Sequence, residues 1–105
     1  MLGLGQAVDL HDHGGSAGAF VVTEGLLREE YVDAAELRRL QFRPGLVRSF
    51  AAGHVHTVWN AGPGAATSIH AYSPPLRSMT FYARDTATAG LQPTHVELVP
   101  KTAAP

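Results

Sequence analysis

The sequence predicts an all-β protein, a small β-barrel or jelly roll, and three observations support this. Eleven glycines and seven prolines are scattered through 105 residues, which favours frequent turns and argues against long helices. About eight short runs rich in β-branched and aromatic residues follow one another between turn sequences. Apolar residues make up 45% of the chain and charged residues 16%, a composition typical of a folded domain.

The first two strands are expected over residues 19–23 and 26–32. Both runs are apolar and contain residues that favour strands, and Gly25 marks a turn between them. Two such runs separated by a short turn predict a β-hairpin.

The next segment permits two interpretations. Asp33-Ala-Ala-Glu36 has the form of a capping box at the start of a helix. In the other interpretation, Leu40 and Phe42 alternate with polar neighbours as in a strand, and Pro44-Gly45 ends the run after too few residues for a stable helix. The strand is favoured.

The rest of the chain continues the pattern of short strands and turns. The turns contain Gly or Pro and lie around residues 51–53, 61–64 and 73–75. Further strands are expected over residues 47–50, 54–60, 66–72, 80–83 and 94–99.

Length and charge limit the domain organisation and the partners. A chain of this length forms one core, so we expect one domain over residues 1–100 and a flexible tail over residues 101–105. The net charge is −1 and no block of Lys or Arg is present, so we expect no nucleic-acid partner. No run approaches the about 18 apolar residues of a membrane span, and the start does not resemble a signal peptide. Cysteine is absent, which excludes disulfides and a thiol nucleophile and fits the cytoplasm.

The histidines are the most informative residues. Four of the six form two His-x-His pairs, His11 with His13 and His54 with His56. On a strand, residues at i and i+2 point to the same side of the sheet, so both imidazoles of a pair can hold one ion. A lone histidine in a core is usually a hydrogen-bonded structural residue. Two pairs in so short a chain favour a metal site with one or two ligands from the second pair.

The residues around these pairs resemble the two signature motifs of the cupin superfamily. The first motif is matched by Gly5, His11, His13 and Gly25, with Gly18 where a Glu usually stands. The second motif is matched by Gly45, Gly53, His56 and Asn60, with Ala51 in place of a Pro. The resemblance implies a single cupin domain in which His56 is the third ligand and His54 is its neighbour.

Within the superfamily, the chain resembles bacterial-type members of the cysteine dioxygenase family, type I. The resemblance runs from about Gly5 to Tyr82, and Ser68–Leu76 is its most specific part. It implies that His11, His13 and His56 hold Fe(2+). It also implies that a small thiol and O2 are the substrates and that both oxygen atoms end on sulfur as a sulfinate. Without the Glu, three neutral imidazoles would leave a site of net charge +2, which suits an anionic substrate that chelates.

Ser68, His70 and Tyr72 are the candidate catalytic residues. They lie at i, i+2 and i+4, so on one strand they share a face and can exchange hydrogen bonds. A serine hydrolase would need an oxyanion hole and usually an orienting carboxylate, and the sequence marks neither. The resemblance implies that the Tyr72 hydroxyl lies at the iron, oriented by His70 and Ser68. Tyr72 as an aromatic core residue is the alternative.

The chain departs from the family at several places. Without cysteine, the cysteine–tyrosine cross-link of animal members cannot form at Gly18, and bacterial-type members also have Gly there. The family has a cis peptide bond at the position of Ser73–Pro74. The family's Arg or Gln that binds the substrate carboxylate has no counterpart before His11, nor has the helical N-terminal region. Arg28, Arg77 and Arg84 are the candidate substitutes, although arginines of this kind are more often solvated surface residues. A missing strand would leave a sheet edge through which a homodimer forms.

We therefore expect an iron-dependent thiol dioxygenase that converts L-cysteine, or a related small thiol such as 3-mercaptopropionate, to the sulfinic acid. The alternative is a metal-binding cupin without turnover, because the carboxylate clamp is missing. A third interpretation is a ligand-binding cupin with structural histidines.

Overall fold

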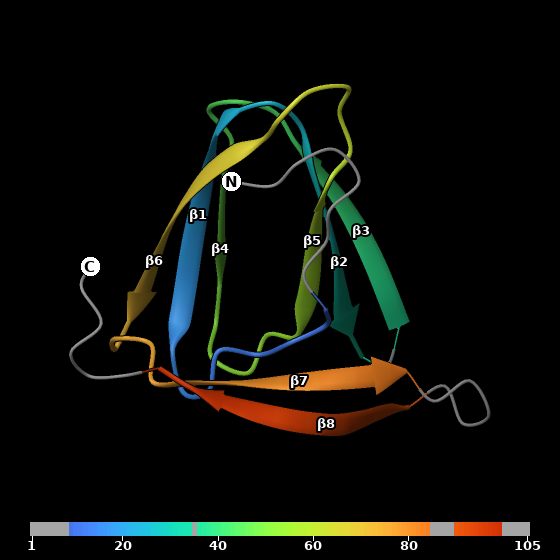
Figure 1. Ribbon diagram of the computed structural model, residues 1–105, viewed down its shortest axis with the longest axis vertical. Helices are drawn as coiled ribbons and strands as arrows, with labels where there is room; N and C mark the ends of the chain where they lie inside the picture. Colours follow the sequence, from blue (N-terminus) through green and yellow to red (C-terminus); the bar gives the residue numbers. More distant parts are fainter. Residues whose placement is uncertain (1–8, 35, 85–89, 100–105) are drawn as a thin grey trace.

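The computed structural model describes residues 9–34, 36–84 and 90–99. Within these ranges the chain forms eight strands and no helix, which confirms the predicted all-β fold (Figure 1). The strands are β1 Ala17–Glu24, β2 Leu27–Asp33, β3 Glu36–Phe42, β4 Val47–Phe50, β5 His56–Asn60, β6 Thr67–Ser73, β7 Ser78–Arg84 and β8 Leu91–Leu98. The Gly5 position and the expected tail over residues 101–105 lie outside the described residues. No described helix is long and apolar enough to cross a membrane.

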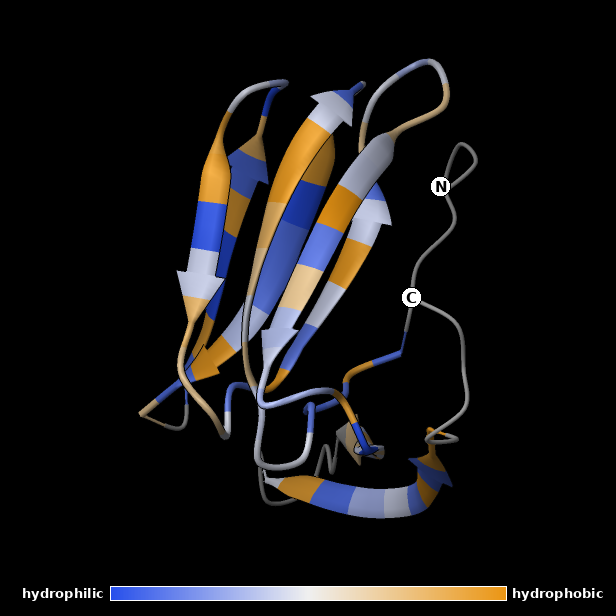
Figure 2. Cartoon of the chain, turned by 90° about the vertical axis from the view of Figure 1, so that its left-hand side faces the viewer, coloured by the Kyte–Doolittle hydropathy of each residue, from blue (hydrophilic) through white to orange (hydrophobic). Residues whose placement is uncertain are grey.

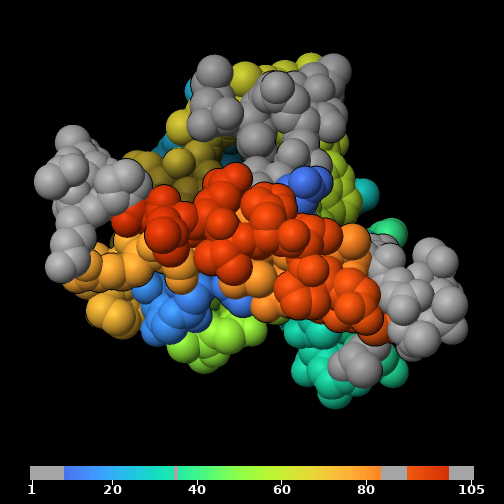
Figure 3. Space-filling model, turned by 60° about the horizontal axis from the view of Figure 1, so that its bottom comes forward, coloured from blue at the N-terminus to red at the C-terminus, as the bar shows by residue number. Residues whose placement is uncertain are grey.

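Two antiparallel sheets face each other, one with the strand order β4-β1-β6 and the other with the order β3-β2-β5. The β7–β8 hairpin runs across one end of both sheets (Figure 1). In the space-filling view this hairpin spreads over the forward face of the molecule (Figure 3). The arrangement is that of a small cupin-like β fold, in which no pairing among the described strands closes the two sheets into a barrel.

The core lies between the two sheets and follows from the alternation of side chains along each strand. In β1, Phe20 and Val22 are buried while Val21 points outward. Bands of hydrophobic and hydrophilic residues alternate along the strands in Figure 2. The buried apolar cluster contains Phe20, Val22, Leu27, Phe42, Phe50, Val58 and Ala66.

The predicted hairpin between the first two strands is wrong, although the turn is present. β1 pairs with β4 and β6, whereas β2 pairs with β3 and β5. Gly25 has a φ of 78°, and a Cβ atom there would lie 2.4 Å from the Ala65 carbonyl oxygen. The chain therefore turns a corner at Gly25 and passes from one sheet to the other.

The segment that follows is a strand, so the helix alternative is excluded. Asp33 and Glu36 face each other across the tight β2–β3 turn, with Ala34 at a φ of 49°. Arg38 Nε lies 2.8 Å from Asp33 Oδ2 and Arg38 Nη2 lies 3.6 Å from Glu36 Oε2. The two acidic residues of the apparent capping box thus pair with Arg38, Asp33 across the turn and Glu36 along β3.

The segment that precedes β1 connects the β7–β8 hairpin to the sheet formed by β3, β2 and β5. His11 forms isolated antiparallel bridges with His56 of β5 and with Phe81 of β7. The backbone nitrogen of His11 donates to the His56 carbonyl at 3.0 Å, and the reverse bond is also 3.0 Å long. In addition, Tyr82 N donates to Leu10 O at 2.8 Å. The first histidine pair therefore sits in an extended, bridging segment and not in the regular strand that its spacing suggested.

The corner at Gly25 yields a stability prediction. We expect Gly25→Ala to lower the free energy of unfolding by about 2–4 kcal/mol, because the new methyl group meets backbone atoms and the positive φ is unfavourable for alanine. Urea unfolding followed by the fluorescence of Trp59, the single tryptophan, measures this. Gly64→Ala is the control, since a Cβ atom there has no neighbour within 4 Å. Equal stabilities of the two variants would contradict the role given to Gly25.

Candidate metal centre

Three histidines from two distant parts of the chain converge between the sheets. His11 and His13 come from the bridging segment, and His56 begins β5. Their side chains are buried, and one nitrogen from each lies within 4.8 Å of the other two. The ring centroids are 4.9 to 5.0 Å apart. The fold therefore brings together all three metal ligands that the sequence predicts.

The protonation of these imidazoles suits metal binding. Nδ1 of His11 donates to the Asp9 carbonyl at 2.6 Å, and Nδ1 of His56 donates to the Glu29 carboxylate at 2.6 Å. Each ring therefore keeps its Nε2 lone pair free when neutral. Burial, reinforced by the other histidines, lowers the pKa of His13 to about 3, and burial also lowers the pKa of His11.

The donor set also fits a divalent transition metal. Nδ1 of His13 is buried and has no hydrogen-bond partner among the described residues. A buried polar atom without a hydrogen-bond partner is unfavourable unless a bound group interacts with its ring. Neutral imidazoles are ligands that iron, zinc and copper accept, and ligation requires the neutral form.

A cavity of about 280 Å³ opens beside the three histidines. Ser68, His70 and Tyr72 project into it from one face of β6, as their spacing predicts. Apolar side chains from other strands form the opposing wall. The lining residues are His11, His13, Leu27, His56, Val58, Ala66, Ser68, His70, Tyr72 and Met79.

The contacts among the three β6 residues differ in part from the expected chain of hydrogen bonds. Ser68 Oγ and His70 Nε2 are 2.7 Å apart, so these two side chains are hydrogen-bonded. The rings of His70 and Tyr72 stack with centroids 6.5 Å apart, and the Tyr72 hydroxyl has no hydrogen-bond partner among the described residues. Burial raises the pKa of Tyr72, so its hydroxyl keeps its proton at neutral pH.

Gly18 leaves room for an aromatic ring. It lies opposite Tyr72 and Phe50 on the two neighbouring strands, and a Cβ atom there would lie 2.5 Å from Phe50 Cζ. The Phe50 ring stands 5.0 Å from the His13 ring and 5.2 Å from the His56 ring. An aromatic ring therefore fills the space beside Gly18, and none of the described residues lining the cavity is acidic.

Asp12 fastens the first histidine pair to β7. Its side chain does not line the cavity. Oδ1 accepts from Gly14 N at 3.0 Å and Thr80 N at 3.1 Å, and Oδ2 accepts from the Tyr82 hydroxyl at 2.7 Å. Burial alone would raise the pKa of Asp12, but these hydrogen bonds, led by that from Tyr82, lower it. The carboxylate thus holds the backbone between His11 and His13.

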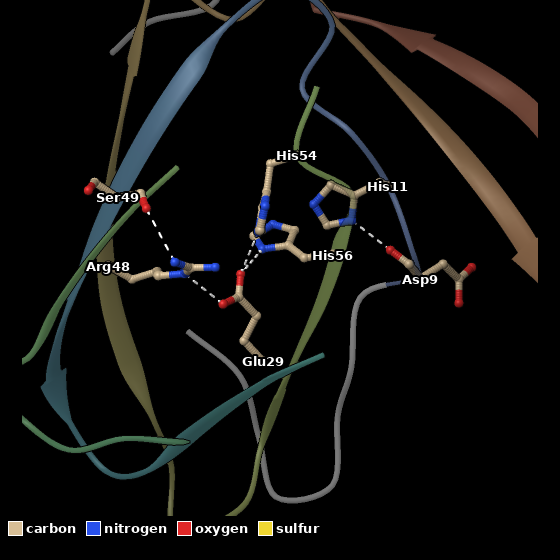
Figure 4. A network of polar contacts seen from close by, with 7 residues as sticks. All are labelled: Asp9, His11, Glu29, Arg48, Ser49, His54 and His56. Atoms are coloured by element: carbon tan, nitrogen blue, oxygen red, sulfur yellow. Dashed lines mark hydrogen bonds and ion pairs between the residues drawn. The ribbon is translucent and has the colours of Figure 1, made fainter. Parts of the chain in front are cut away.

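A buried carboxylate that the sequence analysis missed lies behind His56 (Figure 4). The Glu29 side chain is fully buried; its Oε1 accepts from Arg48 Nε at 2.9 Å. Its Oε2 accepts from His54 Nε2 at 2.9 Å and from His56 Nδ1 at 2.6 Å. Burial raises the pKa of Glu29, but the bonds from both histidines and the charges of His56 and Arg48 outweigh it and lower the pKa to about 2. The alternation of side chains along this segment could have indicated it, because Glu29 shares the inward face of β2 with Leu27.

The candidate substitutes for a carboxylate clamp do not reach the cavity. Arg28 bonds to Gln41 at 3.0 Å and lies over the Trp59 ring, and Arg77 is exposed. The side chain of Arg84 lies outside the described part of the structure. No described Arg or Lys lines the cavity.

The expected cis peptide bond is present at Ser73–Pro74, directly after the cavity-lining part of β6. Ser16 Oγ donates to the Pro74 carbonyl at 2.8 Å, which joins this loop to the segment that carries His13.

An all-β fold with three converging imidazoles in its interior that could hold a metal ion is typical of a metal-binding protein of the cupin type. The comparison with protein families agrees with this class. The family model "Cysteine dioxygenase type I" matches residues 1–85, so the chain belongs to this family.

One similar solved structure shows the fold alone. The crystal structure of Peruvianin-I, described as a cysteine peptidase from Thevetia peruviana latex, aligns with a TM-score of 0.60 and 22% identity over 68% of this chain. The chain spans 44% of that protein's length. Among curated proteins, none matches this chain.

The Asp12–Tyr82 contact yields a second stability prediction. We expect Tyr82→Phe to lower the free energy of unfolding by about 1 kcal/mol, because it removes a hydrogen bond to a carboxylate that stays partly buried. Urea unfolding measures the difference. The control is Tyr31→Phe, since the described residues offer the Tyr31 hydroxyl no hydrogen-bond partner. A Tyr82→Phe variant as stable as this control would show that the contact adds nothing.

Proposed function

We propose that this protein is an iron-dependent thiol dioxygenase that oxidises L-cysteine, or a related small thiol such as 3-mercaptopropionate, to the sulfinic acid. The balanced reaction is RSH + O2 → RSO2H, in which sulfur supplies all four electrons and no further reductant is needed. The observation that carries the proposal is the single cavity shared by the three histidines and by Ser68, His70 and Tyr72. The family assignment supports the same reaction class.

In this proposal His11, His13 and His56 hold Fe(2+). Ferrous iron, when bound, supplies redox-active coordination positions for a thiolate and for O2. Three neutral imidazoles leave the positive charge of the ion uncompensated on the cavity side, where the described lining contains no carboxylate. That charge favours a substrate that arrives as an anion.

The walls of the cavity have different roles. Tyr72 keeps its proton and so presents a hydrogen-bond donor toward the reacting groups. The Ser68–His70 pair is polar and bonded, and the His70 ring stacks beside Tyr72. Leu27, Val58 and Met79 are apolar and limit the water that can enter. We propose Tyr72 as the residue that orients substrate or oxygen, with His70 and Ser68 holding its ring.

One observation favours the alternative, a metal-binding cupin without turnover. No described Arg or Lys lines the cavity, so nothing among these residues offers a charged partner for a substrate carboxylate. A thiol would then bind through the ion and through neutral donors alone, such as the hydroxyls of Ser68 and Tyr72.

Oxygen uptake decides between these two functions. We expect iron-loaded protein to consume O2 with cysteine or 3-mercaptopropionate and to form the sulfinate in equal amount, while His56→Ala loses both iron and activity. Cysteamine, which lacks a carboxylate, tests whether that group matters for binding. Stoichiometric iron without O2 uptake on any of the three thiols would establish the alternative function.

The role of Tyr72 has its own test. We expect Tyr72→Phe to lower turnover about tenfold or more while the iron content stays unchanged, because only the hydroxyl is lost. Steady-state oxygen uptake and a colorimetric iron assay provide the two readouts. Tyr31→Phe, which changes a tyrosine outside the cavity lining, should keep full activity. Unchanged turnover of Tyr72→Phe would remove the residue from the catalytic set.

We also propose a cytoplasmic location and a homodimer formed through a sheet edge. Among the described strands, β6 has no partner on its outer side, and Ile69 on this strand is 62% exposed. Strand edges of this kind pair readily with another chain. Light scattering coupled to size-exclusion chromatography should report twice the chain mass, and a monomer at micromolar concentration would contradict the proposal.

A further inference from the structure

The ring of His56 is held from behind by a charged group. Both carboxylate oxygens of Glu29 act as acceptors: Oε1 receives the Arg48 guanidinium, and Oε2 receives the N–H groups of His54 and His56 (Figure 4). An oxygen that already accepts these bonds requires the proton of His56 to be on Nδ1. The lone pair of His56 is then on Nε2, on the side of the ring away from Glu29.

We propose that Glu29 is the positioning residue of the metal centre, which fixes the ring orientation and the tautomer of His56 and strengthens this imidazole as a ligand. The inference rests on the proposed function, because it takes His11, His13 and His56 as the ligands. Carboxylates that accept the second N–H of a ligating histidine act in this way at metal sites.

The Nδ1 atoms of the three ligands have different hydrogen-bond partners. This difference distinguishes a positioning role of Glu29 from general packing. Nδ1 of His11 donates to a backbone carbonyl, and Nδ1 of His13 has no partner in the described structure. Of the three, His56 is the ligand whose described partner carries a charge, at 2.6 Å. A negative charge draws the Nδ1 proton more strongly than a carbonyl does, so Nε2 of His56 becomes the best electron donor of the set.

A purely structural role explains this carboxylate poorly. Removing a carboxylate from water is unfavourable, and an apolar residue beside Leu27 would fill the same core space without that penalty. Glu29 is tolerated because it receives three N–H donors, and two of these belong to histidines.

The same residues do not make a second metal site. Glu29, His54 and His56 are close enough to hold an ion, but the Arg48 guanidinium already occupies Oε1 and would repel a cation. The guanidinium is itself held over the Tyr31 ring at 4.7 Å. Distances of 2.6 and 2.9 Å from the ring nitrogens to Oε2 are those of hydrogen bonds.

Metal affinity under anaerobic conditions tests the proposal. We expect Glu29→Gln, which keeps the shape but loses the charge, to raise the Kd for Fe(2+) or Co(2+) about 10- to 100-fold in competition with a chromophoric chelator. Glu30→Gln is the matched control, because Glu30 is equally buried on the neighbouring position of β2 but pairs with Arg39. Its Kd should stay within about threefold of wild type. Equal Kd values for Glu29→Gln and wild type would overturn the proposal.

A second variant covers the case in which Glu29→Gln does not fold. Glu29→Gln combined with Arg48→Met replaces the buried ion pair by neutral side chains, an exchange that proteins often tolerate. The double variant should show the same weakened metal binding, and wild-type affinity in the folded double variant would overturn the proposal.

The tautomer of His56 provides a readout independent of metal and of activity. In metal-free wild-type protein, long-range ¹H–¹⁵N spectra should show the His56 proton on Nδ1, and the Glu29→Gln variant should show a mixture of both tautomers. A proton on Nε2 in wild type would refute the role of Glu29. Failure of wild type to bind metal, with the Nδ1 tautomer present, would instead refute the proposed function.

Discussion

Two backbone hydrogen bonds between His11 and His56 bring the two halves of the site together. These residues are far apart in sequence, and each donates its backbone N–H to the other's carbonyl at 3.0 Å. Residues paired in this way lie side by side, so two of the three imidazoles start from neighbouring backbone positions. Asp12, bonded to Thr80 and Tyr82, then holds the chain between His11 and His13 against β7. The whole donor set depends on this short bridging segment.

Charge at the centre is balanced outside the cavity. The described cavity lining contains imidazoles, hydroxyls and apolar side chains, whereas the carboxylate of Glu29 and the guanidinium of Arg48 lie behind His56. A carboxylate placed among the ligands would reduce the charge that a bound ion presents to a substrate. The Glu29 carboxylate instead bonds to Nδ1 of His56 and does not line the cavity. It therefore acts on His56 without reducing the charge that a bound ion would present on the cavity side.

Local sequence patterns predicted most of the elements and the polar residues that line the cavity, but not its apolar wall of Leu27, Val58, Ala66 and Met79. Alternating side chains identified the strands, and the spacing of His11 with His13 and of Ser68 with His70 and Tyr72 put them on common faces. The hairpin at Gly25 was wrong because strand pairing is decided by distant segments, and a turn signal does not show to which sheet the chain returns. The alternation along β2 places Glu29 on the inward face with Leu27, but it does not identify the partners of the carboxylate, because His54 and His56 follow two strands later in the sequence.

The Phe50 ring, which occupies the space beside Gly18, also has an electrostatic consequence. It is buried against His13, His54 and His56, with ring centroids 4.8 to 5.2 Å away. An aromatic ring has no dipole that reorients as water does, so the local dielectric constant on this side is low. Low-dielectric walls confine field lines to the open side of a site, so Phe50 would direct the field of an ion held by the histidines into the cavity.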